Sequence, residues 1–403
     1  MKATFKILSL AMVVVFMYSC TTPQKQDISK YQNISDSIKG VYAPDKRVAL
    51  FNIELAQEGE SILLKGESDQ PKAVAELKQE LTNSGVKFID SISMLPDASV
   101  GETKYAVVNN SVANIRSKGK HSGELATQAI LGMGLKVLKI DGDFYLVQTP
   151  DAYISWVDHG GVTLMNDEEY LAWNKAHKVI YTQTWGYTYE KNDDKTTKVS
   201  DVVLGNQLKY LGEEKNYYKV QYPDKRIAFV KKSESTMYNK WIEEVKPSAE
   251  LIESYAKEFI GAPYLWGGTS TKGMDCSGFT KTVYYMNGFI IPRDASQQIN
   301  AGKDIDPELK FENLEKGDLM FFGKKATDST KQKVTHVGIW LGNGKGEFIH
   351  ASKQVRMSSI NPESSYYDEG NTKRYLGSRR YLGEKDKMIT DLKTEKVLTE
   401  ILD

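Results

Sequence analysis

The sequence MDCSGF at residues 274–279 places a single cysteine, Cys276, at the start of a predicted helix. Asp275 is a residue type that favours the N-cap position, and residues 280–286 continue with partly apolar, helical spacing. The N-terminus of a helix carries partial positive charge and favours a thiolate, so this setting predicts a lowered pKa for the Cys276 thiol. Taken alone, an isolated cysteine is more often a small buried apolar side chain.

Two histidines further along the chain favour a catalytic role for Cys276 over that of a buried apolar side chain. The segments that hold His336 and His350 have the composition of strands, and Asn343-Gly344 between them is a strong signal for a hairpin turn. If the hairpin is symmetric about Asn343, the two histidines face each other, with Cβ atoms about 5 Å apart. One ring then orients the other while the first contacts the thiol of Cys276. A one-residue shift in register would place the rings on opposite faces.

Six motifs between residues 247 and 383 occur in the order of a known family. They are PYLWGG (263–268), DCSGF (275–279), PRDASQQ (292–298), GDLMFF (317–322), HVGI (336–339) and HAS (350–352). The region therefore resembles an NlpC/P60 family cysteine peptidase, which has a papain-like fold. The resemblance implies that Cys276 is the nucleophile, His336 the general base and His350 the polar residue that orients the base.

An internal repeat precedes this region. LGMGLK at residues 131–136 matches LGNQLK at residues 204–209, and the offset persists without a gap through Asp151 and Asp224. Each copy has short alternating strands separated by turn residues, which predicts a small closed barrel. Both copies resemble bacterial SH3 domains.

The sequence predicts a multidomain fold: a small α/β N-terminal module, two SH3-like β-barrels and an α+β papain-like catalytic domain. In the module, strands are expected over residues 47–53, 61–65 and 86–92 and a helix over 72–81. The expected boundaries are a signal peptide over 1–19, a tether over 20–45, the module over 46–100, a first SH3 domain over 101–160, a linker helix over 161–177, a second SH3 domain over 178–246, the peptidase domain over 247–383 and a tail over 384–403. The spacing of Leu and Ile in the tail favours a helix.

The family resemblance also implies a substrate. NlpC/P60 enzymes cleave peptidoglycan stem peptides, commonly between γ-D-glutamate and a diamino acid such as meso-diaminopimelate. Two SH3 copies before the peptidase are similar to the dipeptidyl-peptidase VI type, in which the first SH3 domain walls off the cleft so that only stems with a free N-terminal L-Ala fit. The implied substrate contacts are Tyr264, Trp266, Asp275, Ser277 and Ser296 in the peptidase domain and Glu124 and Tyr153 in the first SH3 domain. A carboxylate such as that of Asp275 or Glu124 can pair with the α-ammonium group of the substrate. The alternatives are a non-catalytic cell-wall-binding lipoprotein and a thiol amidase or acyltransferase on the same fold.

The composition narrows the function classes. The 403 residues include 53 basic and 53 acidic side chains, so no basic excess exists to neutralise phosphates and a nucleic-acid partner is not expected. Two cysteines, Cys20 and Cys276, are too few for a disulfide scaffold or a cysteine-based zinc site. The proposed thiol chemistry requires no metal and no organic cofactor.

The N-terminus predicts export. Two lysines precede the apolar residues 7–17, and small Ser19 then precedes Cys20. The pattern resembles a bacterial lipoprotein signal, in which Cys20 becomes the lipidated first residue; the alternative is an ordinary secretory signal. Either interpretation places the mature chain outside the cytoplasm. We expect a monomer held in the cell envelope by a lipid anchor, periplasmic or at the cell surface, acting on peptidoglycan stem peptides.

Overall fold

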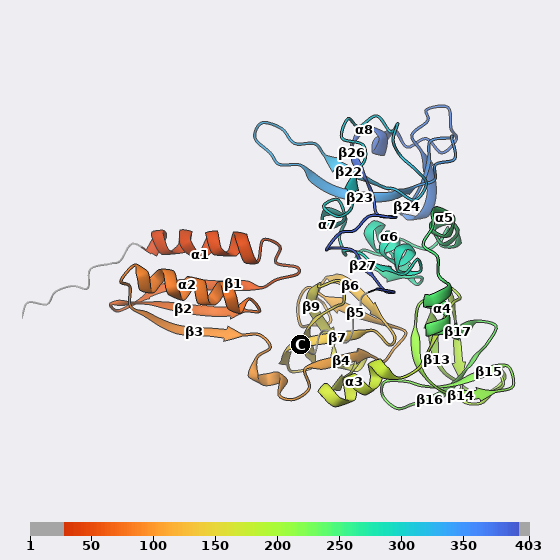
Figure 1. Cartoon of the computed structure of the whole chain (residues 1–403), viewed down its shortest axis with the longest axis horizontal. Coiled ribbons are helices and arrows are strands. Elements are labelled where there is room, and N and C mark those ends of the chain that lie inside the picture. Colours follow the sequence, from red (N-terminus) through yellow and green to blue (C-terminus); the bar gives the residue numbers. More distant parts are fainter. Residues whose placement is uncertain (1–27, 395–403) are drawn as a thin grey trace, which may run out of the picture. The chain divides into compact units, whose positions relative to one another are not determined.

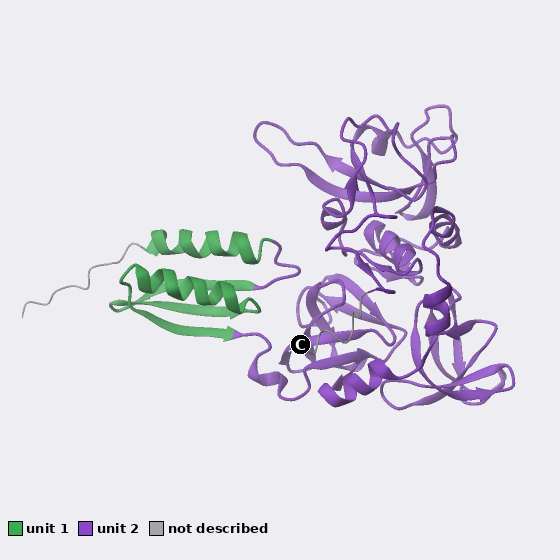
Figure 2. Cartoon of the chain, viewed as in Figure 1, with its two compact units in different colours: residues 1–44, 51–93 green, residues 45–50, 94–403 purple. Residues whose placement is uncertain are grey.

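The computed structural model describes residues 28–394 and divides them into two compact units (Figure 2). The first unit holds residues 28–44 and 51–93, and the second holds residues 45–50 and 94–394. The chain therefore leaves the first unit for six residues and then returns to it. No helix between residues 28 and 394 is long and apolar enough to cross a membrane.

The first unit combines two helices with a small sheet. Its elements are α1 (Ile28–Tyr42), β1 (Phe51–Glu58), β2 (Ser61–Ser68), α2 (Pro71–Asn83) and β3 (Phe88–Met94), with the strand order β1-β2-β3. Proline at the first position of α2 is compatible with a helix start, and the buried residues of α2 recur at helical spacing. Helix α1 occupies most of the segment expected to be a tether. The first strand begins at Phe51, so the strand expected from residue 47 starts four residues too early.

Two seven-stranded sheets follow in the second unit (Figure 1). The first contains β4 (Tyr105–Val108), β5 (Val112–Arg116), β6 (Leu125–Ile130), β7 (Gly134–Asp141), β8 (Phe144–Gln148), β9 (Ile154–Asp158) and β10 (Val162–Met165). The second contains β11 (Lys178–Tyr181), β12 (Trp185–Tyr189), β13 (Lys198–Val203), β14 (Gln207–Glu214), β15 (Tyr217–Gln221), β16 (Ile227–Lys231) and β17 (Ser235–Met237). We call these two domains the first and second barrels; helix α3 (Asp167–Lys175) connects them.

The internal repeat is visible in the strand order. The first sheet has the order β10-β4-β7-β8-β9-β5-β6, and the second, followed from β17, has the order β17-β11-β14-β15-β16-β12-β13, in which each strand occurs seven places later in the chain. The matching glycines Gly132 and Gly205 both have left-handed backbone angles, with φ of 85° and 84°. Glycine adopts this conformation at little cost, which explains why the Leu-Gly pair recurs at the same turn.

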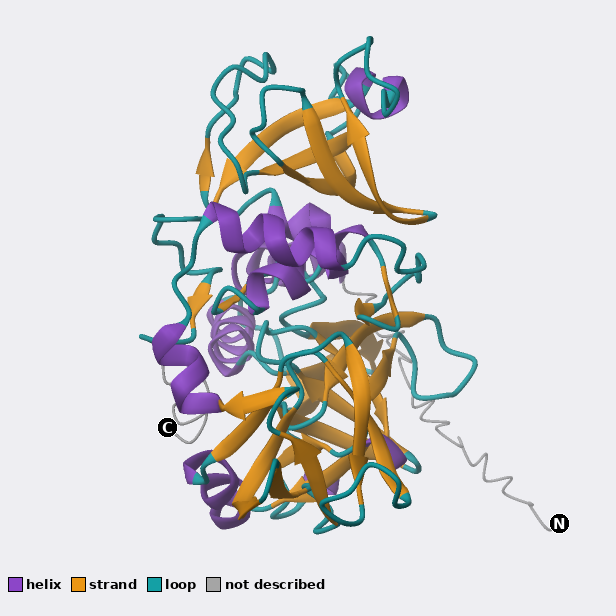
Figure 3. Ribbon diagram, turned by 90° about the vertical axis from the view of Figure 1, so that its right-hand side faces the viewer, coloured by secondary structure: helices purple, strands orange, loops and turns teal. Residues whose placement is uncertain are grey.

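The last part of the second unit packs helices against a six-stranded antiparallel sheet (Figure 3). The sheet has the strand order β21-β26-β22-β23-β24-β25. The helices of this part are α4 (Tyr238–Glu244), α5 (Ala249–Glu258), α6 (Cys276–Tyr285), α7 (Ala295–Gln298) and α8 (Glu369–Lys373). Its strands are β21 (Lys303–Asp304), β22 (Leu319–Lys324), β23 (Lys333–Trp340), β24 (Glu347–Ser352), β25 (Gln354–Ser359) and β26 (Tyr375–Arg380). Apolar residues of α6, such as Phe279 and Val283, share one buried core with Val337 and Ile339 of β23. The catalytic cysteine predicted from the sequence therefore begins a helix that is packed on the strand of the first predicted histidine.

Short strand pairs complete this domain. β18 (Thr269–Ser270) pairs with β19 (Gly273–Met274) just before α6, and β20 (Phe289–Ile290) pairs with β27 (Thr390–Asp391) near the end of the described chain. The expectation of a helical tail is therefore wrong for residues 384–394, where the chain forms β27 and turns. Residues 395–403 lie outside the described part.

Candidate active site

Cys276 lies at the first position of α6. Asp275 is the N-cap, and its Oδ1 accepts a hydrogen bond of 2.7 Å from the backbone N–H of Gly278. The helix start is packed tightly against the preceding loop, because a Cβ atom on Gly278 would lie 2.0 Å from the carbonyl oxygen of Gly268. Cys276 is 7% exposed and lines a cleft of about 310 Å³. The sulfur is thus held at the wall of a cavity that a ligand can enter.

A buried arginine fixes Asp275. Arg293 Nη2 and Nη1 donate to the two carboxylate oxygens of Asp275 at 2.7 and 3.1 Å, and Nη1 also donates to Ser277 Oγ at 3.0 Å. Arg293 Nε donates to Thr127 Oγ1 of the first barrel at 3.0 Å. Because the backbone of Gly267 and Gly278 also donates to Asp275, both of its carboxylate oxygens are occupied. This arrangement suits a positioning role for Asp275.

His336 and His350 meet, although the predicted register is wrong. Ile339 pairs with Ile349 and Trp340 with Phe348, so the hairpin is symmetric about position 344 and not 343. A Cβ atom on Gly338 would lie 3.2 Å from Cβ of His350, which places His350 opposite Gly338. His336 is then a diagonal neighbour on the same face, and its Nε2 lies 2.7 Å from His350 Nδ1. Moving the turn centre by one residue changes the cross-strand partner of each residue by two positions. Residues two apart in a strand lie on the same face, so the two histidines share a face even though the predicted register was wrong.

A general-base role for His336 determines where both rings must carry their protons. His350 Nε2 lies 3.0 Å from Ser358 Oγ on the neighbouring strand β25. With Nε2 of His336 engaged by His350, Nδ1 is the nitrogen of His336 left to exchange a proton with a thiol. His336 must then carry its hydrogen on Nε2, and His350 must accept at Nδ1 and donate from Nε2 to Ser358. Ser358 Oγ can accept from Nε2 in that tautomer, so Ser358 supports it.

The thiol pKa expected from the helix N-terminus is not what the structure gives. Burial, followed by the negative charge of Asp275, raises the pKa of Cys276 to about 12. Burial, followed by His350, holds the pKa of His336 well below its usual value, and burial lowers the pKa of His350 to about 3. Desolvation of the thiolate outweighs the favourable helix terminus. Both shifts favour the uncharged form, a thiol at Cys276 and a neutral imidazole at His336.

The predicted substrate contacts gather around the same cleft, with one exception. Trp266, Asp275, Ser277, Ser296, Glu124 and Tyr153 all line it together with Cys276. Trp266 of the catalytic domain is 61% exposed, and its Nε1 donates to Glu124 Oε1 of the first barrel at 2.7 Å. Tyr264 is not among the lining residues; burial and then the nearby Cys276 raise its pKa. The first barrel and the catalytic domain thus form opposite walls of one cleft.

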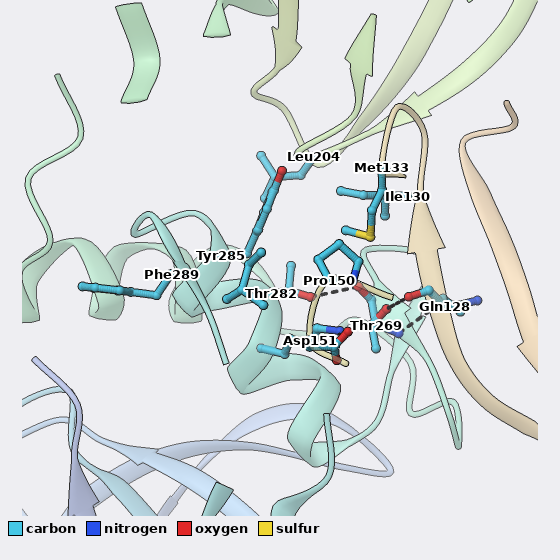
Figure 4. Close-up of a pocket in the computed structure, with 12 residues that line it drawn as sticks. Gln128, Ile130, Met133, Pro150, Asp151, Leu204, Thr269, Thr282, Tyr285 and Phe289 are labelled. Atoms are coloured by element: carbon cyan, nitrogen blue, oxygen red, sulfur yellow. Dashed lines mark hydrogen bonds and ion pairs between the residues drawn. The ribbon is translucent and has the colours of Figure 1, made fainter. Parts of the chain in front are cut away.

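Both barrels also contact the helix that carries Cys276. Lys281 of α6 forms an ion pair of 2.6 Å with the buried Asp151 of the first barrel, and Gln207 of the second barrel donates to the hydroxyl of Tyr285 at 3.0 Å. Figure 4 shows the apolar junction between these contacts, where Thr282 and Tyr285 face side chains from both barrels. The labelled barrel residues there are Gln128, Ile130, Met133, Pro150, Asp151 and Leu204. Three domains therefore determine where the helix, and with it the thiol, is placed.

Comparison with known proteins identifies the catalytic domain. The model of the NlpC/P60 family matches residues 261–380, and that of the bacterial dipeptidyl-peptidase Sh3 domain matches residues 115–161. A γ-D-glutamyl-L-lysine dipeptidyl-peptidase of Bacillus cereus is 32% identical over 276 residues, which cover 65% of this chain and 77% of that protein. The chain belongs to the NlpC/P60 family.

Two further relatives of this NlpC/P60 protein extend over the SH3-like region. The dipeptidyl-peptidase 6 of Lysinibacillus sphaericus is 26% identical over 273 residues, covering 65% of this chain and 94% of that protein. The crystal structure of an NlpC/P60 family protein from Bacillus cereus matches with a TM-score of 0.58 and 27% identity, covering 69% of this chain and 99% of the other. The protein is thus a multidomain cysteine peptidase with an SH3-like domain and an NlpC/P60 catalytic domain.

Sequence reasoning assigned no role to three residues of the NlpC/P60 site. Arg293 lies inside the PRDASQQ motif, so the sequence indicated its place in the domain but did not predict its hydrogen bonds to Asp275. Ser358 is eight residues beyond His350 and carries no motif of its own. Arg47, which also lines the cleft, comes from a segment far upstream that was expected to be a strand. Only the fold brings the last two to the site.

Proposed function

We propose that this enzyme is a cell-wall peptide hydrolase that cleaves the bond between γ-D-glutamate and a diamino acid in stem peptides with a free N-terminal L-Ala. The observation that carries the proposal is the cleft itself, where Cys276 of the catalytic domain faces Glu124 and Tyr153 of the first barrel. A wall supplied by the barrel limits how far a bound chain can extend. The names of the relatives, which are dipeptidyl-peptidases acting on γ-D-glutamyl-L-lysine, support the same bond.

A thiol at the start of α6, which packs on the strand that holds His336, supports acyl transfer through Cys276. His336 Nδ1 accepts the proton of Cys276 as the sulfur attacks the amide carbonyl, since burial favours the uncharged form of both groups. The backbone N–H of Cys276 at the start of α6 is a candidate donor to the oxyanion. The protonated His336 then delivers its proton to the leaving amine. A water molecule, deprotonated by His336, hydrolyses the thioester and restores the free thiol.

His350 and Ser358 support this proton transfer. As His336 gains positive charge, its Nε2–H bond to His350 Nδ1, at 2.7 Å, strengthens. Ser358 can accept from Nε2 of His350 through its 3.0 Å contact, which supports the tautomer that accepts at Nδ1. We therefore assign His336 as general base, His350 as the orienting residue and Ser358 as a positioning residue.

The N-terminal amino group of the substrate has one well-placed partner. Glu124 lines the cleft, and the hydrogen bond from Trp266 Nε1 to its Oε1 leaves the other carboxylate oxygen, Oε2, to accept from an ammonium group. Tyr153, 8% exposed, has its pKa raised first by burial, so its hydroxyl stays protonated and can donate to the substrate. Together they favour a stem peptide that ends at L-Ala over one still attached to the glycan.

Product analysis tests this assignment. Purified enzyme is incubated with free L-Ala-γ-D-Glu-meso-diaminopimelate and, separately, with intact sacculi, and the products are identified by mass spectrometry. We expect L-Ala-γ-D-Glu and the free diamino acid from the tripeptide, and no equivalent release from sacculi. Release of whole stem peptides from the glycan, or transfer of an acyl group, would instead support an amidase or acyltransferase.

We also propose that the enzyme acts in the cell envelope, anchored through lipidated Cys20, as a monomer with a second SH3 domain over residues 178–246. Cys20 and the signal peptide lie outside the described residues. The strand order shared by the two barrels supports the second SH3 domain. Metabolic labelling with a fatty acid tests the anchor: wild type is expected to be labelled and Cys20→Ala is not.

A further inference from the structure

Residues 45–50, which we call the strap, belong to the second unit, although the chain on both sides of them belongs to the first unit. The backbone N–H of Ile154 donates to the carbonyl of Arg47 at 2.7 Å, and Gln148 Nε2 donates to the carbonyl of Val48 at 3.3 Å. Leu50, 8% exposed, belongs to an apolar cluster with side chains of β7, β8 and β9. The strap is thereby fixed to the first barrel beside Tyr153, which directly precedes Ile154.

The side chain of Arg47 crosses from the strap to the catalytic domain. Asp45 holds the guanidinium in a fork, accepting from Nε at 2.8 Å and from Nη2 at 2.7 Å. Nη1 then donates to Asp294 Oδ2 at 2.7 Å and to Ser296 Oγ at 2.9 Å. A second connection runs from Gln297 Nε2 to Asp45 Oδ2 at 2.9 Å. Charge-assisted, two-pronged bonds of this kind impose a defined geometry on both partners.

These contacts join the two walls of the cleft beside Tyr153. The strap is bonded to the first barrel through its backbone and to the start of α7 through its side chains, and Arg47, Tyr153 and Ser296 all line the cleft that contains Cys276. We propose that the strap closes the end of the substrate cleft beside Tyr153, and that Arg47 is a specificity-determining residue that excludes peptides extended beyond their N-terminal L-Ala. The inference rests on the proposed function and adds a structural reason for a dipeptide-length product.

Arg47 also fixes how Ser296 can bind. Because the Ser296 oxygen accepts from Arg47, its own hydroxyl hydrogen is left to donate to an acceptor on the substrate. Loss of Arg47 therefore has two separable effects. The closed end opens, which helps extended peptides, and Ser296 loses its orientation, which raises KM for the natural peptide.

The test compares two peptides that differ in length and not in terminal charge: L-Ala-γ-D-Glu-L-Lys and the same peptide with an added N-terminal Gly. Wild type is expected to cleave the free tripeptide at least about 100-fold more efficiently, by kcat/KM, than the extended peptide. In Arg47→Ala this ratio is expected to fall at least about 10-fold, with KM for the tripeptide increased, and Arg47→Lys is expected to lie between the two.

The second barrel offers a matched control. Like Arg47, Arg226 donates its backbone N–H and its Nε to the aspartate two residues before it: the N–H to Asp224 Oδ1 at 3.2 Å and Nε to Oδ2 at 2.7 Å. Arg226→Ala is expected to leave both rates and their ratio unchanged.

An unchanged ratio in Arg47→Ala, with both rates reduced equally, would overturn the strap proposal, since a merely structural role predicts that result. If Arg47→Ala does not fold, the ratio in Arg47→Lys decides in the same way. Equal cleavage of both peptides by wild type would contradict the closed end of the cleft, and cleavage of neither would contradict the proposed function itself.

Discussion

Replacing Arg293 by Met should be the most damaging single change near the site that spares the catalytic residues. Arg293 is 1% exposed and Asp275 is 6% exposed, so removal of the guanidinium leaves a carboxylate buried without its counter-charge. Breaking a buried ion pair from one side typically costs about 3–5 kcal/mol, which is a factor of roughly 200 to 5,000 in the folding equilibrium. Arg293→Met also removes donors to Ser277 and Thr127, which link the start of α6 to the first barrel.

Urea unfolding at pH 7, followed by circular dichroism, measures the loss of stability. The control is Arg226→Met, whose exposed pair with Asp224 should contribute less than about 1 kcal/mol. The double variant Arg293→Met with Asp275→Asn should recover part of the loss, because the uncompensated charge is then absent. A cost below about 1 kcal/mol for Arg293→Met, or no recovery in the double variant, would refute the claim that this pair is desolvated and coupled.

Three further predictions follow from the histidines and the thiol. The free energy of unfolding should fall as the pH drops below about 6.5, because the unfolded chain binds a proton that buried His350, with its pKa lowered to about 3, does not. The variant His350→Asn should therefore lose less stability on acidification than wild type, by up to about 1.4 kcal/mol per pH unit. Urea titrations of both proteins from pH 7 to 4 measure this, and an equal loss in the two would contradict it. The variant Ser358→Ala should lower kcat about 10-fold with little change in KM. Nitrogen NMR should show a changed tautomer of His350 in this variant, and an unchanged tautomer would contradict the positioning role of Ser358. The free enzyme should show no thiolate absorbance near 240 nm at pH 7, since burial raises the pKa of Cys276 to about 12, and a thiolate signal at that pH would show a preformed ion pair instead.

Much of the catalytic domain was predictable because its signals are local. Asp275 before Cys276 is a capping pattern that depends on adjacent residues, and α6 begins where this pattern indicates. The pairing of His336 with His350 was found for a partly wrong reason: the turn centre was misplaced by one residue, which moves a partner by two and preserves the face. The repeat could be recognised in the sequence because Gly132 and Gly205 occupy the same turn, whose positive φ favours glycine.

What the sequence could not provide depends on long-range contacts and on solvation. Arg47 reaches Asp294 and Ser296 across more than two hundred positions of the chain, and no periodicity links them. The pKa of Cys276 depends on how completely the folded domains exclude water, and local sequence reports only the helix terminus. Ser358 is recruited by the register of β24 and β25, in which His350 pairs with Arg356.

The central claim, that one thiol carries the hydrolysis, is tested most directly by the turnover of Cys276→Ala on free L-Ala-γ-D-Glu-L-Lys. The substitution removes a single sulfur from the start of α6, so the unfolding midpoint should stay close to that of wild type. We predict that kcat falls by at least about 10⁴-fold, as for loss of a nucleophile in other acyl-transfer enzymes. Hydrolysis by Cys276→Ala at a rate near that of wild type would contradict the account.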